Sequence, residues 1–80
     1  MTNQPTGNTM TKAQSTSFNQ IISAAQTGRH TMTQLGIIGR VPGRFGLTAM
    51  GAFLLVKRMI ANGDLILISD SLNCHFVTIP

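Results

Sequence analysis

Four basic side chains are the groups in this chain whose chemistry is easiest to assign. They form two pairs, Arg40 with Arg44 and Lys57 with Arg58, on either side of a largely apolar stretch. Guanidinium and ammonium groups bind anions, and arginine matches phosphate oxygens with paired hydrogen bonds. The pairs therefore indicate a surface that contacts the phosphates of a polyanion, with a solvated basic surface as the alternative.

The charges are distributed unevenly along the chain. It has 80 residues, of which six are Lys or Arg and two are Asp or Glu, and its formal net charge is +4 at pH 7. Both acids, Asp64 and Asp70, follow the last basic residue, so the preceding segment has no acid of its own. Such a segment suits nucleic acid or an anionic lipid surface.

Patterns for catalysis and metal binding are weak. Cys74 beside His75 has the residue types of a nucleophile and its base, but neighbouring side chains of a strand point to opposite faces and cannot pair directly. His30 follows Arg29 in a connection without a carboxylate. One cysteine permits neither an internal disulfide nor a zinc-ligand spacing. We therefore expect no enzyme activity, no cofactor and no metal site.

The length allows one domain, which hides only about 60% of the surface of its unfolded form. Residues 1–15 are mainly polar and predict a flexible tail, whereas residues 16–80 predict the folded domain. No signal peptide is visible, and the uncharged run at 45–56 is shorter than the ~20 apolar residues that cross a bilayer. We expect a cytoplasmic protein with no membrane partner.

The clearest element is a helix over residues 47–63, LTAMGAFLLVKRMIANG. Its apolar residues recur at the three- and four-residue steps that place side chains on one helical face. Lys57 and Arg58 lie near its end, where cations suit the helix dipole, and Gly63 provides the stop. One face of this helix is therefore predicted to be buried.

Two shorter helices are predicted before it. The first covers residues 17–26, with Ser17 and Gln20 as an S-x-x-Q capping box. A second capping box at Thr31 and Gln34 predicts a helix that starts at Met32 and is bounded by a following proline. We assign Gly36 of this helix the role of permitting close approach of a neighbouring helix.

A turn and a hairpin complete the prediction. Residues 41–44, Val-Pro-Gly-Arg, predict a type II turn that presents Arg40 and Arg44. The loop lacks the GK[ST] and GxGxxG patterns, which excludes both nucleotide-binding motifs. Residues 65–68 and 75–79 have strand composition and predict an antiparallel hairpin. Two strands alone are marginal in water, so one face must lie on the helices.

This order resembles a winged helix-turn-helix DNA-binding domain over residues 17–79. The segment 31–36, TMTQLG, looks like the opening of that family's second helix, and residues 77–79, VTI, are similar to the return strand of the wing. The end of the third helix is matched by Val56, Met59, Gly63 and Leu65. The resemblance implies an α+β fold, a three-helix winged helix-turn-helix with a C-terminal β-hairpin.

The resemblance also implies a function, that of a small DNA-binding transcriptional regulator of bacterial, phage or plasmid type. Residues 48–61 would be the recognition helix in the major groove of double-stranded DNA. Thr48 would meet a base edge, Gly51 would allow close approach, and the late basic residues would contact phosphates. The implied DNA-binding residues are Arg40, Arg44, Thr48, Gly51, Leu54, Lys57 and Arg58.

Two other classes of function remain open. One is a protein-binding regulator, of the anti-repressor or inhibitor type, that uses Met50, Leu54 and the acidic hairpin. The other is an interfacial membrane peptide built on residues 46–60. A homodimer is also compatible with a core this small. Salt-sensitive DNA binding, capture of a protein partner and co-sedimentation with liposomes would distinguish the three.

Overall fold

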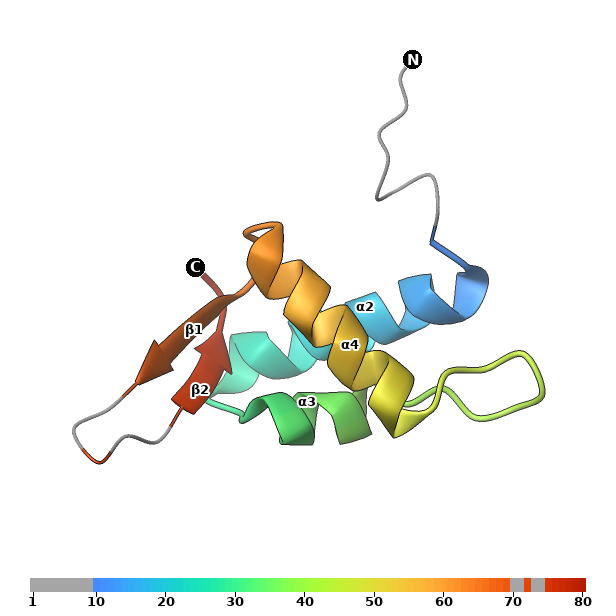
Figure 1. Ribbon diagram of the computed structural model, residues 1–80, viewed down its shortest axis with the longest axis horizontal. Helices are drawn as coiled ribbons and strands as arrows, with labels where there is room; N and C mark the ends of the chain where they lie inside the picture. Colours follow the sequence, from blue (N-terminus) through green and yellow to red (C-terminus); the bar gives the residue numbers. More distant parts are fainter. Residues whose placement is uncertain (1–9, 70–71, 73–74) are drawn as a thin grey trace, which may run out of the picture.

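The computed structural model describes residues 10–69, 72 and 75–80. The elements are α2 (Lys12–Thr27), α3 (Met32–Ile38), α4 (Ala49–Ala61), β1 (Ile66–Ser69) and β2 (His75–Thr78). Three helices are thus followed by a two-stranded antiparallel hairpin, an α+β fold consistent with a winged-helix layout (Figure 1). The predicted fold class is confirmed. Residues 1–9 of the predicted tail lie outside the described residues.

The start of α2 differs from the prediction. Thr11 is the N-cap: its hydroxyl oxygen accepts from the Gln14 amide at 3.1 Å, and the Gln14 side-chain oxygen accepts from the Thr11 amide at 2.9 Å. The predicted capping box at Ser17 and Gln20 is wrong, because Ser17 lies inside the helix and is fully buried. Residues 12–15, which were predicted to belong to the tail, are therefore helical.

The capping box of α3 is confirmed, since the hydroxyl of Thr31 and the side chain of Gln34 form both of its hydrogen bonds. The close approach predicted at Gly36 is also present. A Cβ atom at this position would lie 3.1 Å from the carbonyl oxygen of Ala49 and 3.2 Å from the Cβ of Phe53. The absence of a side chain therefore lets α3 and α4 pack closely.

The helix α4 runs between clear local signals. Thr48 is its N-cap, and Gly63 follows the C-cap with φ of +86°, a left-handed conformation that glycine adopts readily. Its buried side chains are Ala52, Leu55, Val56 and Met59. Leu55, Val56 and Met59 join Ile21 of α2 and Leu35 of α3 in one core. Within the described residues no helix is long and apolar enough to cross a membrane.

The hairpin is anchored through its second strand. In the register of the two strands, Leu67 is opposite Val77. Val77 is fully buried and donates its amide to the carbonyl of His30, between α2 and α3, at 2.7 Å. Leu65, just before β1, is also buried in the core. The prediction that one face of the hairpin packs on the helices is therefore confirmed.

Candidate nucleic-acid interface

The outer side of α4 carries an exposed stripe formed by Met50, Leu54, Lys57 and Arg58. These positions share one side because they are separated by three or four residues along the helix. Met50 is 67% exposed and Leu54 is 52% exposed. The exposed stripe is therefore apolar in the first half of α4 and basic in the second.

Thr48 has a defined task within the helix. Its hydroxyl oxygen accepts a hydrogen bond from the amide of Gly51 at 3.1 Å and so caps the first turn of α4. The hydroxyl proton remains available to an acceptor outside the protein, because the cap uses the oxygen only as an acceptor. Thr48 is exposed, so a contact with a ligand is sterically open.

The absence of a side chain at Gly51 is explained by a contact within the chain. A Cβ atom there would lie 2.7 Å from Cδ1 of Leu47 and 3.1 Å from its Cγ. Leu47 is half-buried and packs against the core. The space beside Gly51 is thus filled by Leu47, and intramolecular packing accounts for this glycine without a ligand.

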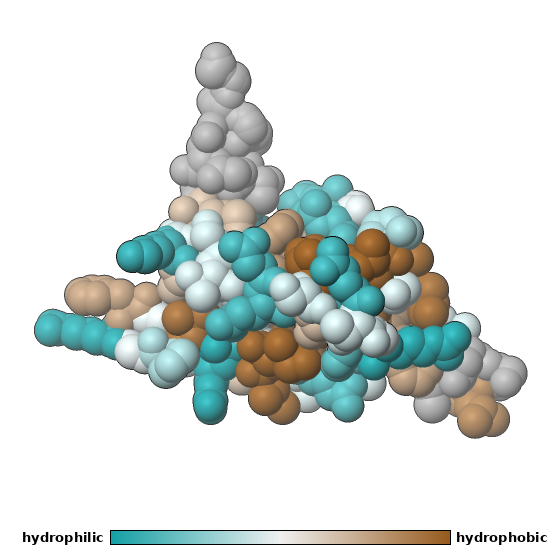
Figure 2. Space-filling model, turned by 180° about the vertical axis from the view of Figure 1, so that it is seen from behind, coloured by the Kyte–Doolittle hydropathy of each residue, from teal (hydrophilic) through white to brown (hydrophobic). Residues whose placement is uncertain are grey.

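Arg40 and Arg44 line one shallow pocket at a projecting loop of residues 41–47. Val41 and Leu47 close this 41–47 loop with two backbone hydrogen bonds, of 2.8 and 2.7 Å. Gly43 has the predicted positive φ, +115°, but the hydrogen-bonded turn joins Gly43 to Gly46 and does not cover the predicted residues 41–44. The loop and the hairpin project from opposite sides of the helices (Figure 1), and from behind the loop stands out at the left edge (Figure 2). Both arginines are exposed.

An aromatic side chain in this loop was missed by the sequence reasoning. Phe45 is 85% exposed, and the guanidinium carbon of Arg44 lies 5.5 Å from the centre of its ring. This geometry is within the range of a cation–π contact. The available sequence signal was a phenylalanine between an arginine and a glycine, outside any helical or strand periodicity.

An apolar groove between α3 and α4 was also missed. It encloses about 330 Å³ and is lined by Thr33, Ile37, Ala49, Met50 and Phe53. Ile37 is 60% exposed although it belongs to a helix whose other face is buried. The groove adjoins the apolar half of the exposed stripe and extends the apolar surface from α4 onto α3.

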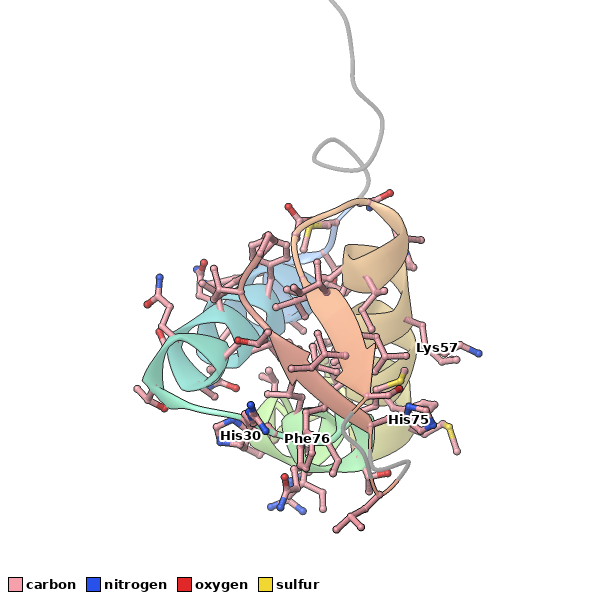
Figure 3. All side chains as sticks on the ribbon, turned by 90° about the vertical axis from the view of Figure 1, so that its left-hand side faces the viewer. His30, Lys57, His75 and Phe76 are labelled. Atoms are coloured by element: carbon pink, nitrogen blue, oxygen red, sulfur yellow. The ribbon has the colours of Figure 1, made fainter. Side chains whose placement is uncertain are left out.

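Figure 3 shows the molecule from the side of the hairpin. Lys57 of α4 and His75 of β2 lie toward the same edge of this view, and His30 and Phe76 lie nearer the connection between α2 and α3. The ring Nδ1 of His75 lies 2.6 Å from the hydroxyl oxygen of Ser69. His30 Nδ1 lies 3.1 Å from the carbonyl oxygen of Gly28. These histidines therefore have local structural partners.

The structure does not describe most residues at the tip of the hairpin. Cys74 and Asp70, which the sequence reasoning considered, lie outside the described residues. In the part of the chain that the structure describes, no three His, Cys, Asp or Glu side chains gather where a metal ion could bind. The groups with functional potential are therefore the basic, aromatic and apolar side chains of the 41–47 loop and of α4.

The four basic residues among the implied DNA-binding residues fall into two groups near the two ends of α4, and Leu54 lies between them. The 41–47 loop and its flank bring Arg40 and Arg44 to the N-terminal end, and Lys57 and Arg58 lie near the C-terminal end. With 13 residues, α4 is about 20 Å long at 1.5 Å per residue. No protein-family model matches the chain, and neither a curated protein nor a solved structure is significantly similar to it.

Proposed function

We propose that this chain is a small DNA-binding regulator of transcription that places α4 against the major groove of double-stranded DNA. The observation that carries the proposal is the presence of exposed basic side chains near both ends of α4, whose outer side is exposed. A chain segment without acids surrounds them, so the local field favours phosphates. The three-helix and hairpin architecture supports the same function.

The dimensions suit such a contact. The major groove is about 12 Å wide, and α4 is about 20 Å long, so both of its ends reach past the groove. Lys57 and Arg58 would contact one phosphate backbone, and Arg40 and Arg44 the other. Such contacts position a protein on the duplex and carry no base information.

The part of the exposed stripe that faces the bases would be apolar. Met50 and Leu54 offer no hydrogen bonds to base edges, but apolar side chains can contact the methyl group of thymine. We therefore expect binding that depends strongly on salt and moderately on sequence, with a preference for sites that contain thymine in the contacted groove.

The test is fluorescence anisotropy with a labelled duplex over a series of salt concentrations. We expect affinity to fall as salt rises, and to be weakened by Lys57→Ala/Arg58→Ala and by Arg40→Ala/Arg44→Ala. A matched control compares the single variants Arg58→Ala and Arg29→Ala, because both remove one exposed guanidinium but Arg29 lies in the connection between α2 and α3. Equal affinities for all variants, or binding that ignores salt, would contradict the proposal.

The apolar groove favours a second candidate, a regulator that binds another protein. Met50 and Ile37 expose apolar surface on two adjoining helices, which is a feature of protein-binding sites. A photo-reactive amino acid in place of Leu54 distinguishes the two functions, because at this position of the exposed stripe it can cross-link to whichever partner binds there. A discrete DNA adduct in cells supports the first function, and a discrete protein adduct without DNA supports the second.

A further inference from the structure

Phe45 is the most exposed large apolar side chain that the structure describes, at 85%. A single exposed apolar residue needs no special explanation. Here, however, the ring belongs to a loop that projects from the body of the molecule (Figures 1 and 2). It also lies next to the side chain of Arg44. The 41–47 loop therefore combines an aromatic ring and a cation in a position that a large ligand can reach.

Hydrogen bonds and a close contact constrain the backbone of the loop. The pair of hydrogen bonds between Val41 and Leu47 closes its base, and Gly46 donates its amide to the carbonyl of Gly43 at 3.1 Å. A Cβ atom at Gly46 would lie 1.9 Å from the carbonyl oxygen of Val41, so only glycine fits this fold of the chain. Phe45 is thus presented by a preorganised loop, which reduces the entropy lost on binding.

The surroundings of the ring are cationic. Arg44 lies over it, and Lys12 of α2 lines the same shallow hollow as Phe45, together with Thr16 and Pro42. Exposed Arg40 lies at the base of the loop. A ring with such neighbours is suited to a ligand that has both flat apolar faces and negative charges, which describes stacked bases and their phosphates.

We infer that the 41–47 loop inserts the ring of Phe45 between two neighbouring base pairs of duplex DNA, in the minor groove beside the major groove that α4 occupies. The inference rests on the proposed function, because α4 must bring the loop to the duplex. Arg44 and Arg40 contact the flanking phosphates and the narrow groove. Insertion partly unstacks one base step and bends the DNA toward the major groove.

A lipid surface is the competing ligand for an exposed phenylalanine among cations. The further apolar side chains of the loop are exposed Pro42 and half-buried Val41 and Leu47, and the positions next to Phe45 are arginine and glycine. Interfacial binding needs a larger buried apolar area than one ring provides. Stacked bases need only the ring itself, so the duplex fits the loop better.

The test uses Phe45→Trp. The chain has no tryptophan or tyrosine, so this variant carries a single reporter at the loop. We expect duplex DNA to quench its fluorescence and to protect it from acrylamide, because the indole stacks on bases. Leu67→Trp is the matched control, since it places the reporter on β1, on the opposite side of the helices, where no quenching is expected (Figure 1).

A second measurement follows the DNA. With 2-aminopurine at the contacted step, the unmodified protein should increase the fluorescence of the duplex by unstacking the base. Phe45→Ala should abolish this increase and weaken binding roughly five- to one-hundred-fold, the range for loss of one aromatic–base stack. Its circular dichroism should be unchanged, because the side chain is exposed.

The outcomes separate the two proposals. Salt-sensitive duplex binding without quenching of the introduced tryptophan, and without a 2-aminopurine signal, overturns the insertion and leaves the proposed function intact. Stronger quenching by single-stranded than by duplex DNA also overturns it, in favour of stacking on unpaired bases. Absence of all DNA binding overturns both proposals, and a blue shift with phosphatidylglycerol vesicles would then identify lipid as the ligand.

Discussion

Ser17 of α2 and Gly39, at the end of α3, are in direct contact. A Cβ atom at Gly39 would lie 2.7 Å from Oγ of Ser17 and 2.8 Å from Cδ1 of Ile21. The two small residues therefore let the end of α3 approach α2, and the 41–47 loop leaves the core from this point. The position of Arg40 depends on this contact, because it directly follows Gly39.

Gly39→Ala is expected to lower the free energy of unfolding by about 1–3 kcal/mol, the usual cost of overpacking a close contact. Urea denaturation followed by circular dichroism measures the change. The double variant Ser17→Ala/Gly39→Ala should lose less than the sum of the single changes, because removal of the Ser17 hydroxyl relieves part of the clash. A neutral effect of Gly39→Ala would mean that α2 and α3 separate at low cost.

Ser17→Ala should raise the free energy of unfolding by about 1 kcal/mol. The Ser17 hydroxyl is buried without a hydrogen-bond partner, and an unsatisfied buried polar group costs about 1–3 kcal/mol.

Thr11→Ala should lower the free energy of unfolding by about 1 kcal/mol, because it removes the N-cap of α2. Thermal unfolding of both variants checks the signs, and destabilisation by Ser17→Ala would indicate that the helix starts at the position predicted from sequence.

Gly46→Ala should open the 41–47 loop while the helical core stays folded, because its Cβ atom cannot be placed beside the carbonyl oxygen of Val41. Amide exchange followed by NMR should show loss of protection at Val41 and Leu47, whose amides bond to each other's carbonyls. Phe45→Ala is the control, since it truncates an exposed side chain and leaves the loop backbone unchanged. Retained protection in Gly46→Ala would contradict the structure of the loop.

The hairpin should show alternating protection of its amides. Val77 donates its amide to His30, so in an antiparallel pair the Val77 amide and carbonyl point away from β1. Leu67, opposite Val77, then has its amide on the outer edge of β1. We expect Leu67 to exchange faster than its neighbours Ile66 and Ile68, and slow exchange at Leu67 would reveal a partner at this edge.

The salt dependence of DNA binding should report the number of phosphates contacted. The slope of log K against log salt should become less steep by about 0.9 for each contact removed. Arg58→Ala should therefore change the slope, whereas Arg29→Ala should leave it unaltered. A loss of affinity with an unaltered slope would mean that Arg58 supports the fold of α4 and does not contact phosphate.

Local signals in the sequence predicted several elements correctly. The capping box of Thr31 and Gln34, the apolar periodicity that ends at Gly63 and the positive φ of Gly43 depend on residues close together in the chain. Such signals act through hydrogen bonds and backbone conformations that involve only residues close together in the chain. The order of three helices and a hairpin follows from them.

The sequence by itself also determined the charge distribution, on which the proposal of a polyanionic partner rests. Only the tertiary structure decided the surroundings of several individual side chains. It placed Ser17 in the core, filled the space at Gly51 with Leu47, and left Phe45 exposed. The burial of Ser17 and the exposure of Phe45 depend on how segments far apart in the chain pack against one another, and no residue type or spacing specifies that geometry.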